Sequence, residues 1–420
     1  MSWPCLTLLL LFVGSFAQGK TTLTAEMGIS SGYIVPADSL VNPNNRVFEQ
    51  ANSDSLADLR AELKVINKKT KYILRPRFTE SFQTYTLTNP DEKKSRSRAK
   101  ADLTDAFIEW TPWDQWQLTA GLFVDGWGPA EFVNPSNPFF HLNFQNKSFF
   151  YKEKGHGLIK VLWNPSAKTT LALTAEPVSN NEPSFRSGDI FKPQAALRGE
   201  WQSGDASQLV GLLVGKENFS EGFVAEYFQL RHNNSGLSVF AEARHSSKTE
   251  RFDIIDQTFY KDLQLKTQDG LKTYSVVGAR WEGRIDARIE WISYNQGYSE
   301  SQWNDLVQSV TQPSPAILNN AEKFSKLGLE FPTKNWWSVS VRTPDLGPWA
   351  DWQWTNRVLI AVGDNPTGTL RSGIFQSDLE MPAYQAWTFL AEIQNNFGNA
   401  NTELALSTRE SYYLGAKYAW

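Results

Sequence analysis

Ser411-Tyr412-Tyr413-Leu414-Gly415-Ala416-Lys417-Tyr418-Ala419-Trp420 closes the chain with an alternation that indicates its fold class. Successive side chains of a β-strand point to opposite faces. In an extended conformation, one face of this segment therefore carries Tyr412, Leu414, Ala416, Tyr418 and Trp420. The segment is predicted to be an amphipathic β-strand that ends on an aromatic side chain.

The same two-residue period recurs along the chain. Leu59, Ala61, Leu63 and Val65 are separated by Arg60, Glu62 and Lys64. Helical spacing fits such runs poorly, whereas alternation is typical of strands with one apolar face. Further runs lie at 22–30, 74–79, 105–110, 116–124, 157–163, 171–175, 195–201, 209–215, 223–230, 237–244, 274–281, 285–291, 325–331, 337–341, 358–362 and 385–393. An all-β protein is predicted.

The composition excludes several classes of protein. The mean hydropathy is −0.42, and the longest apolar run, Leu6–Val13, is far shorter than the roughly 20 residues of a membrane-spanning helix. The net charge of −4 does not favour a nucleic-acid partner. The 17 Trp, 13 Tyr and 26 Phe residues favour a membrane, because amphipathic rings collect at the interface between lipid and water.

The first residues have the pattern of a secretion signal. Leu6–Val13 is an apolar core, and Ser15-Phe16-Ala17 follows as a small-x-small cleavage site. We expect residues 1–17 to be a signal peptide and residues 18–420 to form one barrel with long external loops. Cys5 is the only cysteine, so we expect the mature chain to have no disulfide.

Tryptophan placement favours a transmembrane barrel over a soluble sandwich or propeller. Seven tryptophans stand at strand ends beside turns, where an interfacial girdle would lie: Trp110, Trp116, Trp163, Trp201, Trp281, Trp291 and Trp337. Within hydrocarbon every backbone polar group must be paired, so a membrane-spanning sheet has to close on itself. A closed antiparallel transmembrane β-barrel is therefore predicted.

The polar faces of the strands carry charges of both signs, as a water-filled lumen would. The candidate pore-lining residues are Arg60, Glu62, Lys64, Arg75, Arg77, Asp105, Glu109, Lys160, Arg198, Glu200, Glu242, Arg244, Arg288 and Glu290. A basic ladder of Arg75, Arg77, Lys160 and Arg198 opposite acidic Glu200, Glu242 and Glu290 would create a transverse field. The alternative is that each is simply a solvated charge on the inner wall.

Connection lengths alternate between short turns and long polar segments. Segments 89–100, 126–156 and 246–271 are predicted to be loops, and this asymmetry is typical of outer-membrane barrels. At roughly 22 to 28 residues per strand with its connection, the length corresponds to about 14 to 18 strands, and we expect about 16.

The terminal segment resembles the last strand of bacterial (Gram-negative) outer-membrane β-barrel proteins, which typically end in Phe or Trp. The resemblance implies a porin-like barrel in the cell outer membrane. It also implies that Tyr412, Leu414, Ala416, Tyr418 and Trp420 form the signal read by the barrel-assembly machinery. The other interpretation, an ordinary amphipathic closing strand, is compatible with this role.

The segment 125–140 is rich in Gly, Pro and Asn, residues that fix turns. Its Trp-Gly and Asn-Pro-x-Asn-Pro-Phe elements are similar to a segment of several families of large porin-like proteins. Folded into the barrel, it would form a constriction loop. An external loop or an aromatic anchor at the rim is the alternative. The candidate constriction residues are Trp127, Asn134, Asn137, Phe139 and Phe140.

The function expected from these features is passive diffusion of small hydrophilic solutes, without a cofactor or metal. Outer-membrane lipid, the assembly machinery and the solutes are the expected partners, and a homo-oligomer is left open. The alternatives are a closed structural, polysaccharide-binding or export barrel, and a barrel hydrolase.

The sequence offers little for a hydrolase. The histidines His141, His156, His232 and His245 lack metal-ligand spacing. Asp105 and Glu109 would lie about 13 Å apart on one strand, beyond the usual spacing of glycosidase carboxylates.

Overall fold

The computed structural model describes residues 19–39, 45, 49–86, 93–137, 139, 154–177, 193–217, 221–256, 261–311, 333–346, 351–363, 370–383, 386–399, 402 and 408–420. The predicted signal peptide, residues 1–17, lies outside them, and so does the predicted strand at 325–331.

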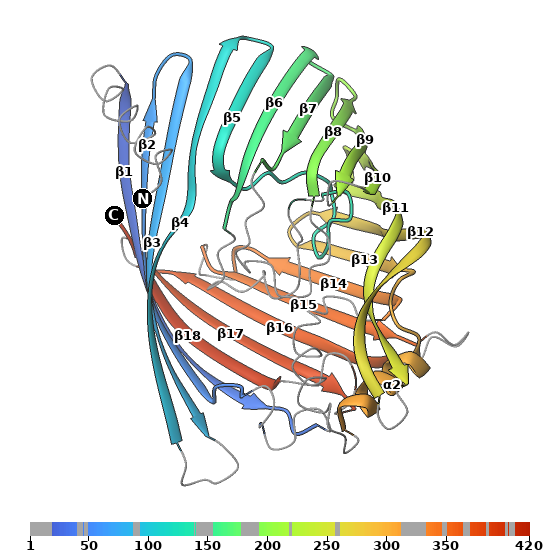
Figure 1. Ribbon diagram of the computed structural model, residues 1–420. Helices are drawn as coiled ribbons and strands as arrows, with labels where there is room; N and C mark the ends of the chain where they lie inside the picture. Colours follow the sequence, from blue (N-terminus) through green and yellow to red (C-terminus); the bar gives the residue numbers. More distant parts are fainter. Residues whose placement is uncertain are drawn as a thin grey trace.

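The described residues form one antiparallel sheet of 18 strands that closes into a barrel (Figure 1). Each strand pairs with the next along the chain, and β1 also pairs with β18, from Glu26↔Ala419 to Pro36↔Thr408. The strands are β1 (Lys20–Pro36), β2 (Ser53–Ile66), β3 (Thr70–Thr86), β4 (Lys93–Trp113), β5 (Trp116–Phe123), β6 (His156–Ser166), β7 (Thr169–Ala175), β8 (Pro193–Gln202), β9 (Gln208–Glu217), β10 (Glu221–His232), β11 (Leu237–Asp256), β12 (Lys261–Glu282), β13 (Asp286–Tyr294), β14 (Asn335–Thr343), β15 (Gln353–Val362), β16 (Leu370–Pro382), β17 (Trp387–Gly398) and β18 (Thr408–Ala419).

The predicted fold class, an all-β closed antiparallel barrel, is confirmed, but the expected strand number of about 16 is too low. The observed 18 strands lie at the upper end of the estimated range of about 14 to 18. Some connections are short: only positions 218–220 separate β9 from β10, and positions 257–260 separate β11 from β12. Short connections such as these bring the spacing to the lower end of the assumed residues per strand.

Two predicted loops are largely strand. Segment 89–100 is paired with β3 from Lys93 onward, and segment 246–271 contains the ends of β11 and β12, joined in register as far as Asp256↔Lys261. Outside hydrocarbon both faces of a strand meet water, so these extensions need no apolar face. Because both of their faces are polar, these segments were predicted to be loops.

The apolar faces of the strands point outward. Leu23, Leu212 and Leu414 are 71%, 56% and 69% exposed, although they are among the most apolar side chains of their strands. Six of the seven predicted girdle tryptophans are exposed on the same outer face: Trp110, Trp116, Trp201, Trp281, Trp291 and Trp337. The seventh, Trp163, stacks on Trp116 with ring centroids 5.6 Å apart. This outer surface suits lipid.

Leu59 gives a direct test of which face meets lipid. It lies near the middle of β2 on the outer face, between Met27 and Phe78 of the neighbouring strands. Leu59→Arg should destabilise the barrel in bilayers by about 2–4 kcal/mol, because a cation near the bilayer midplane loses its hydration. The control Leu59→Ala removes the side chain without adding charge and should cost much less. Urea unfolding from lipid vesicles measures both, and equal effects would contradict an outer lipid face.

A helix that was not predicted, α2 (Glu300–Thr311), follows β13 and contacts β11 and β12. It buries Trp303, Leu306 and Val307. No helix in the described part of the chain is long and apolar enough to cross a membrane.

Candidate functional site

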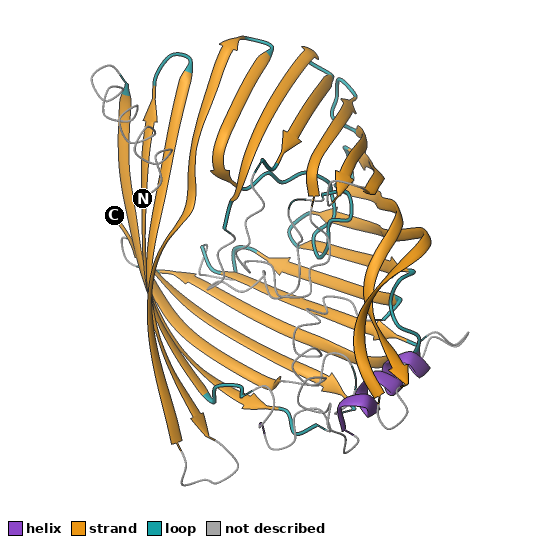
Figure 2. Ribbon diagram, in the orientation of Figure 1, coloured by secondary structure: helices purple, strands orange, loops and turns teal. Residues whose placement is uncertain are grey.

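After β5 the chain crosses the interior of the barrel (Figure 2). We call Asp125–Asn137 the inner loop. Its Phe132 and Val133 are each 1% exposed and pack against apolar side chains of six consecutive strands, β11 to β16. These wall residues are Phe240, Tyr274, Val276, Ile292, Trp336, Leu359, Ala361 and Ile374. The loop is therefore held by a small hydrophobic core inside the barrel.

A second apolar cluster holds the beginning of the inner loop against β5 to β10. Trp127 and Phe139 meet edge to face with ring centroids 6.3 Å apart, within a cluster that includes Leu213 and Tyr227. The guanidinium of Arg198 lies 4.7 Å from the centroid of the Trp127 ring. This distance is suited to a cation–π interaction.

The two asparagines of the quoted motif shape the loop from within. The side-chain amide of Asn134 donates a hydrogen bond to the backbone carbonyl of Trp127. Asn134 Oδ1 accepts a hydrogen bond from the backbone N–H of Asn137 at 3.0 Å. The Asn137 side chain donates to the carbonyl of Asp125 at 2.8 Å and accepts from the Phe139 N–H at 3.1 Å. Four of the five candidate constriction residues are thus brought together. The fifth, Phe140, lies outside the described residues.

Glu242 of β11 is the first polar anchor of the loop. Its carboxylate accepts the Ala130 N–H at 2.7 Å, the Ser136 hydroxyl at 2.9 Å and the Ser136 N–H at 3.4 Å. Gly128 has a φ of +87°, and a Cβ there would lie 2.7 Å from Glu242 Oε1. A side chain at position 128 would therefore both strain the backbone and displace the anchor.

Glu290 of β13 is the second anchor. Its carboxylate accepts the Glu131 N–H at 2.7 Å, the Phe132 N–H at 3.1 Å and the Ser338 hydroxyl at 3.3 Å. The side chain is fully buried. A buried carboxylate requires donors to offset its lost hydration, and the loop backbone supplies two of them.

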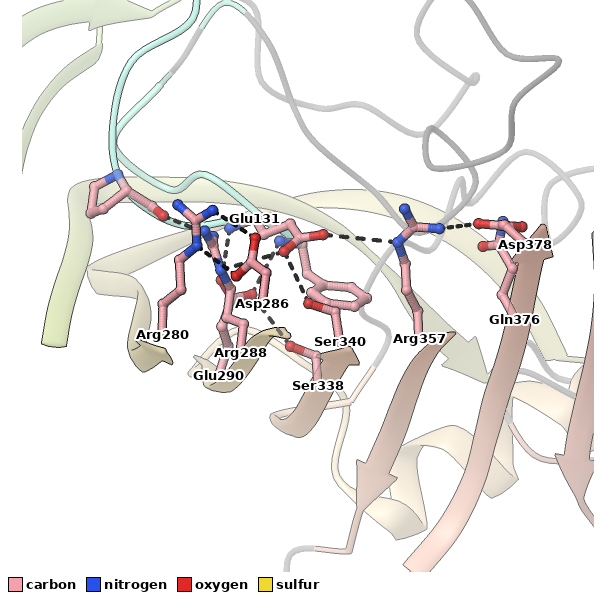
Figure 3. A network of polar contacts seen from close by, with 12 residues as sticks. Glu131, Arg280, Asp286, Arg288, Glu290, Ser338, Ser340, Arg357, Gln376 and Asp378 are labelled. Carbon is pink, nitrogen blue, oxygen red and sulfur yellow. Dashed lines mark hydrogen bonds and ion pairs between the residues drawn. The ribbon is translucent and has the colours of Figure 1, made fainter. Parts of the chain in front are cut away.

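Glu131 lies between two arginines of the wall (Figure 3). Its carboxylate accepts the Ser340 hydroxyl at 3.0 Å and lies 3.4 Å from Arg288 Nε and 3.8 Å from Arg357 Nε. Arg288 also donates a hydrogen bond to the carbonyl of Pro129 at 2.9 Å. Arg357 donates a hydrogen bond to the carboxylate of buried Asp378. The site therefore joins a loop acid to cations of two strands, β13 and β15.

Most of the other predicted pore-lining residues have a polar or aromatic partner close by, on the same strand, on a nearby strand or in the inner loop. Arg75 binds Glu62 at 2.6 Å and Asp105 at 3.0 Å, and Lys160 binds Asp125 at 2.6 Å. Asp58 forms ion pairs with Arg60 and Arg77, and Glu109 lies 3.4 Å from Lys71. Glu200 accepts a hydrogen bond from the Tyr227 hydroxyl. The Arg244 guanidinium lies over the Tyr274 ring. Lys64 lies on β2 on the same face as Arg60 and Glu62.

These pairings bear on the predicted basic ladder. Arg75 and Arg77 are engaged by acids of β2 and β4, whereas Glu242 and Glu290 are engaged by the inner loop. Arg198, by contrast, lies 3.6 Å from Glu200, so one predicted cation is beside one of the predicted acids. The transverse field stays a prediction.

Sequence reasoning missed Asp125, Glu131, Ser340, Arg357 and Asp378. The sequence does carry a signal for the position of the loop, at places where the alternation of apolar and polar residues is interrupted. Val276-Val277 and Trp336-Trp337 place apolar side chains on both faces of a strand, one toward the outside and one buried within. Such doubled apolar positions mark where the inner wall packs against the loop.

Three of the four histidines lie in the described part of the chain, each beside its own polar partner. His156 begins β6, where Nδ1 lies 3.8 Å from Glu176. His232 ends β10 and contacts Ser235, while His245 of β11 contacts Glu226 and Thr273. His141 is outside the described residues.

Comparisons with known proteins place the fold. No protein-family model and no curated protein sequence matches the chain. Among solved structures, Pseudomonas aeruginosa OccK7 (OpdD) is similar with a TM-score of 0.55 at 9% identity, covering 96% of this chain and 99% of that chain. P. aeruginosa OccK11 (OpdR) has a TM-score of 0.54 at 9% identity, with 96% and 97% covered. A BenF-like porin from Pseudomonas fluorescens has a TM-score of 0.52 at 9% identity, with 96% and 99% covered. At such identities the likeness is one of fold, and the fold is the porin-like barrel that the terminal strand led us to expect.

Proposed function

We propose that this protein is an outer-membrane channel for the passive diffusion of small hydrophilic solutes. The observation that carries the proposal is the sidedness of the sheet. Leucine and tryptophan side chains cover the outside, while ion pairs such as Arg75–Asp105 and Lys160–Asp125 line the inside. Charged side chains on an inner wall favour water there, and the similar solved structures include porins.

The inner loop is the proposed constriction. It crosses the interior and is fastened at both anchors, so solutes would pass between it and the strands outside its two apolar clusters, β17, β18 and β1 to β4. Trp127, Asn134, Asn137 and Phe139 would act by keeping the loop folded in this position. The pore-lining roles of the predicted charges belong to the same proposal.

Liposome swelling tests the channel. Vesicles containing the protein should swell in isotonic solutions of small neutral sugars, and the rate should fall as the sugar grows from a monosaccharide to a tetrasaccharide. Swelling no faster than in protein-free vesicles would reject the channel and favour a closed structural barrel.

We propose further that β18 is the segment recognised by the barrel-assembly machinery. Its face of Tyr412, Leu414 and Trp420 is exposed outward, and Trp420 exchanges two backbone hydrogen bonds with Ala25 at 3.0 and 3.1 Å. Trp420→Ala should reduce the assembled fraction in cells by roughly fivefold or more, measured as heat-modifiable protein in outer-membrane extracts. Trp337→Ala, on the outer face of β14 and away from β18, is the control. Equal assembly of both variants would contradict the proposal.

A further inference from the structure

A pocket of about 370 Å³ opens on the inner wall between β3 and β6, beside the root of the inner loop. Arg75, Asp105, Glu109, Gln117, Asp125 and Lys160 supply its polar lining, and Phe107 and Phe123 supply aromatic surface. Cavities of this size with a few convergent polar groups are typical of small-molecule sites.

The charges of the pocket disfavour an ionic ligand. Arg75 is already bound by Glu62 and Asp105, and Lys160 by Asp125. Asp105 and Asp125 are 3% and 7% exposed, so both acids are largely shielded from water, whereas the Arg75 side chain is 34% exposed. The lining holds three carboxylates against two cations. An anion would meet a net negative lining, and a cation would have to compete with arginine and lysine for each acid.

The remaining surface suits a neutral ring with many hydroxyl groups. Phe107 and Phe123 lie 5.6 Å apart at an angle of 57° and offer apolar contact. Gln117 and Thr119 lie on the inward face of β5, next to Lys160 of β6 and Glu109 of β4. Groups that both donate and accept, placed around aromatic rings, match the hydroxyl rim and C–H faces of a sugar.

We propose that this pocket is a binding site for a neutral, hexose-sized sugar. The proposal rests on the proposed function and deepens it by naming a class of solute for the channel. The aromatic rings would hold one face of the sugar, and the paired charges would hydrogen-bond its hydroxyl groups without attracting ions.

Three probes of one ring size and different charge test the proposal: glucose, glucuronate and, at pH 6, protonated glucosamine. Binding to the full-length protein in detergent is measured by saturation-transfer NMR, which needs no conduction. Glucose should bind at least about fivefold more tightly than either ion. Phe107→Ala should weaken glucose binding by roughly tenfold, whereas Phe389→Ala, on the outer face of β17, should leave it unchanged.

Gln117→Ala, a smaller change in the same pocket, provides a second variant should Phe107→Ala fail to fold, and it should also weaken glucose binding. Equal binding of the three probes, tighter binding of an ion, or unchanged glucose binding in the pocket variants would overturn the proposal. Conduction separates the two claims. A protein that conducts ions but does not bind glucose refutes the sugar site alone, and one that binds glucose but does not conduct refutes the channel alone.

Discussion

Removing both anchors of the inner loop, in Glu242→Ala/Glu290→Ala, should raise the open-channel conductance by roughly twofold or more and make it noisy. The two carboxylates accept four backbone N–H groups of the loop, from Ala130, Glu131, Phe132 and Ser136. Each buried donor left without an acceptor costs about 1–3 kcal/mol. The loop should therefore leave its packed position, so that those groups reach water.

The matched control is Glu62→Ala/Glu109→Ala. It removes the same two charges from the inner wall, at residues whose ion pairs are with Arg75 and Lys71 and not with the loop. Its conductance should change much less than that of Glu242→Ala/Glu290→Ala, because the inner loop keeps both anchors. Glu242→Gln/Glu290→Gln keeps one acceptor oxygen at each site and should fall between. Single-channel recording in potassium chloride compares all three, and a wild-type conductance in the double alanine variant would contradict the anchoring role.

Glu131→Gln should shift ion selectivity toward anions by about threefold or more in the chloride-to-potassium permeability ratio. The Glu131 carboxylate lies within 4 Å of two guanidinium groups, and the side chains of Arg288 and Arg357 are only 11% and 14% exposed. Neutralising the acid leaves an excess of positive charge in a narrow, poorly screened region. Reversal potentials across a salt gradient measure the shift.

Asp205→Asn is the control for Glu131→Gln. Asp205 lies in the turn between β8 and β9, where hydrogen bonds from Ser203 and Ser207 hold its pKa at about 2. It is therefore charged at neutral pH, and its replacement removes one negative charge outside the lumen. Selectivity that changes equally in both variants would mean that net charge, and not the position of Glu131, determines the preference.

The alternation of apolar and polar side chains predicted the barrel and its sidedness because hydrocarbon imposes one requirement on every strand. Leu59 and Leu414 face outward, and Arg60 faces inward, as their positions in sequence indicate. The requirement ends where the bilayer ends. The extensions of β4 near Lys93 and of β11 near Asp256 are strands without that pattern, so sequence reasoning assigned them to loops.

The candidate site was less predictable, because its contacts join residues that are distant in sequence. Glu242 and Glu290 were identified as inward-facing charges, yet nothing local to them indicates that they bind the backbone of residues 130–136. The Asn-Pro motif did indicate a stiff loop. Its partners follow only from the closure of the barrel, which brings β11 and β13 across from β5.

The central claim is that the barrel encloses a water-filled path beside an inner loop, and single-channel recording in planar bilayers tests it most directly. The purified protein should give discrete steps of one size that open at low voltage and persist. Heat-modifiable, lipid-inserted protein that yields no steps would contradict the account.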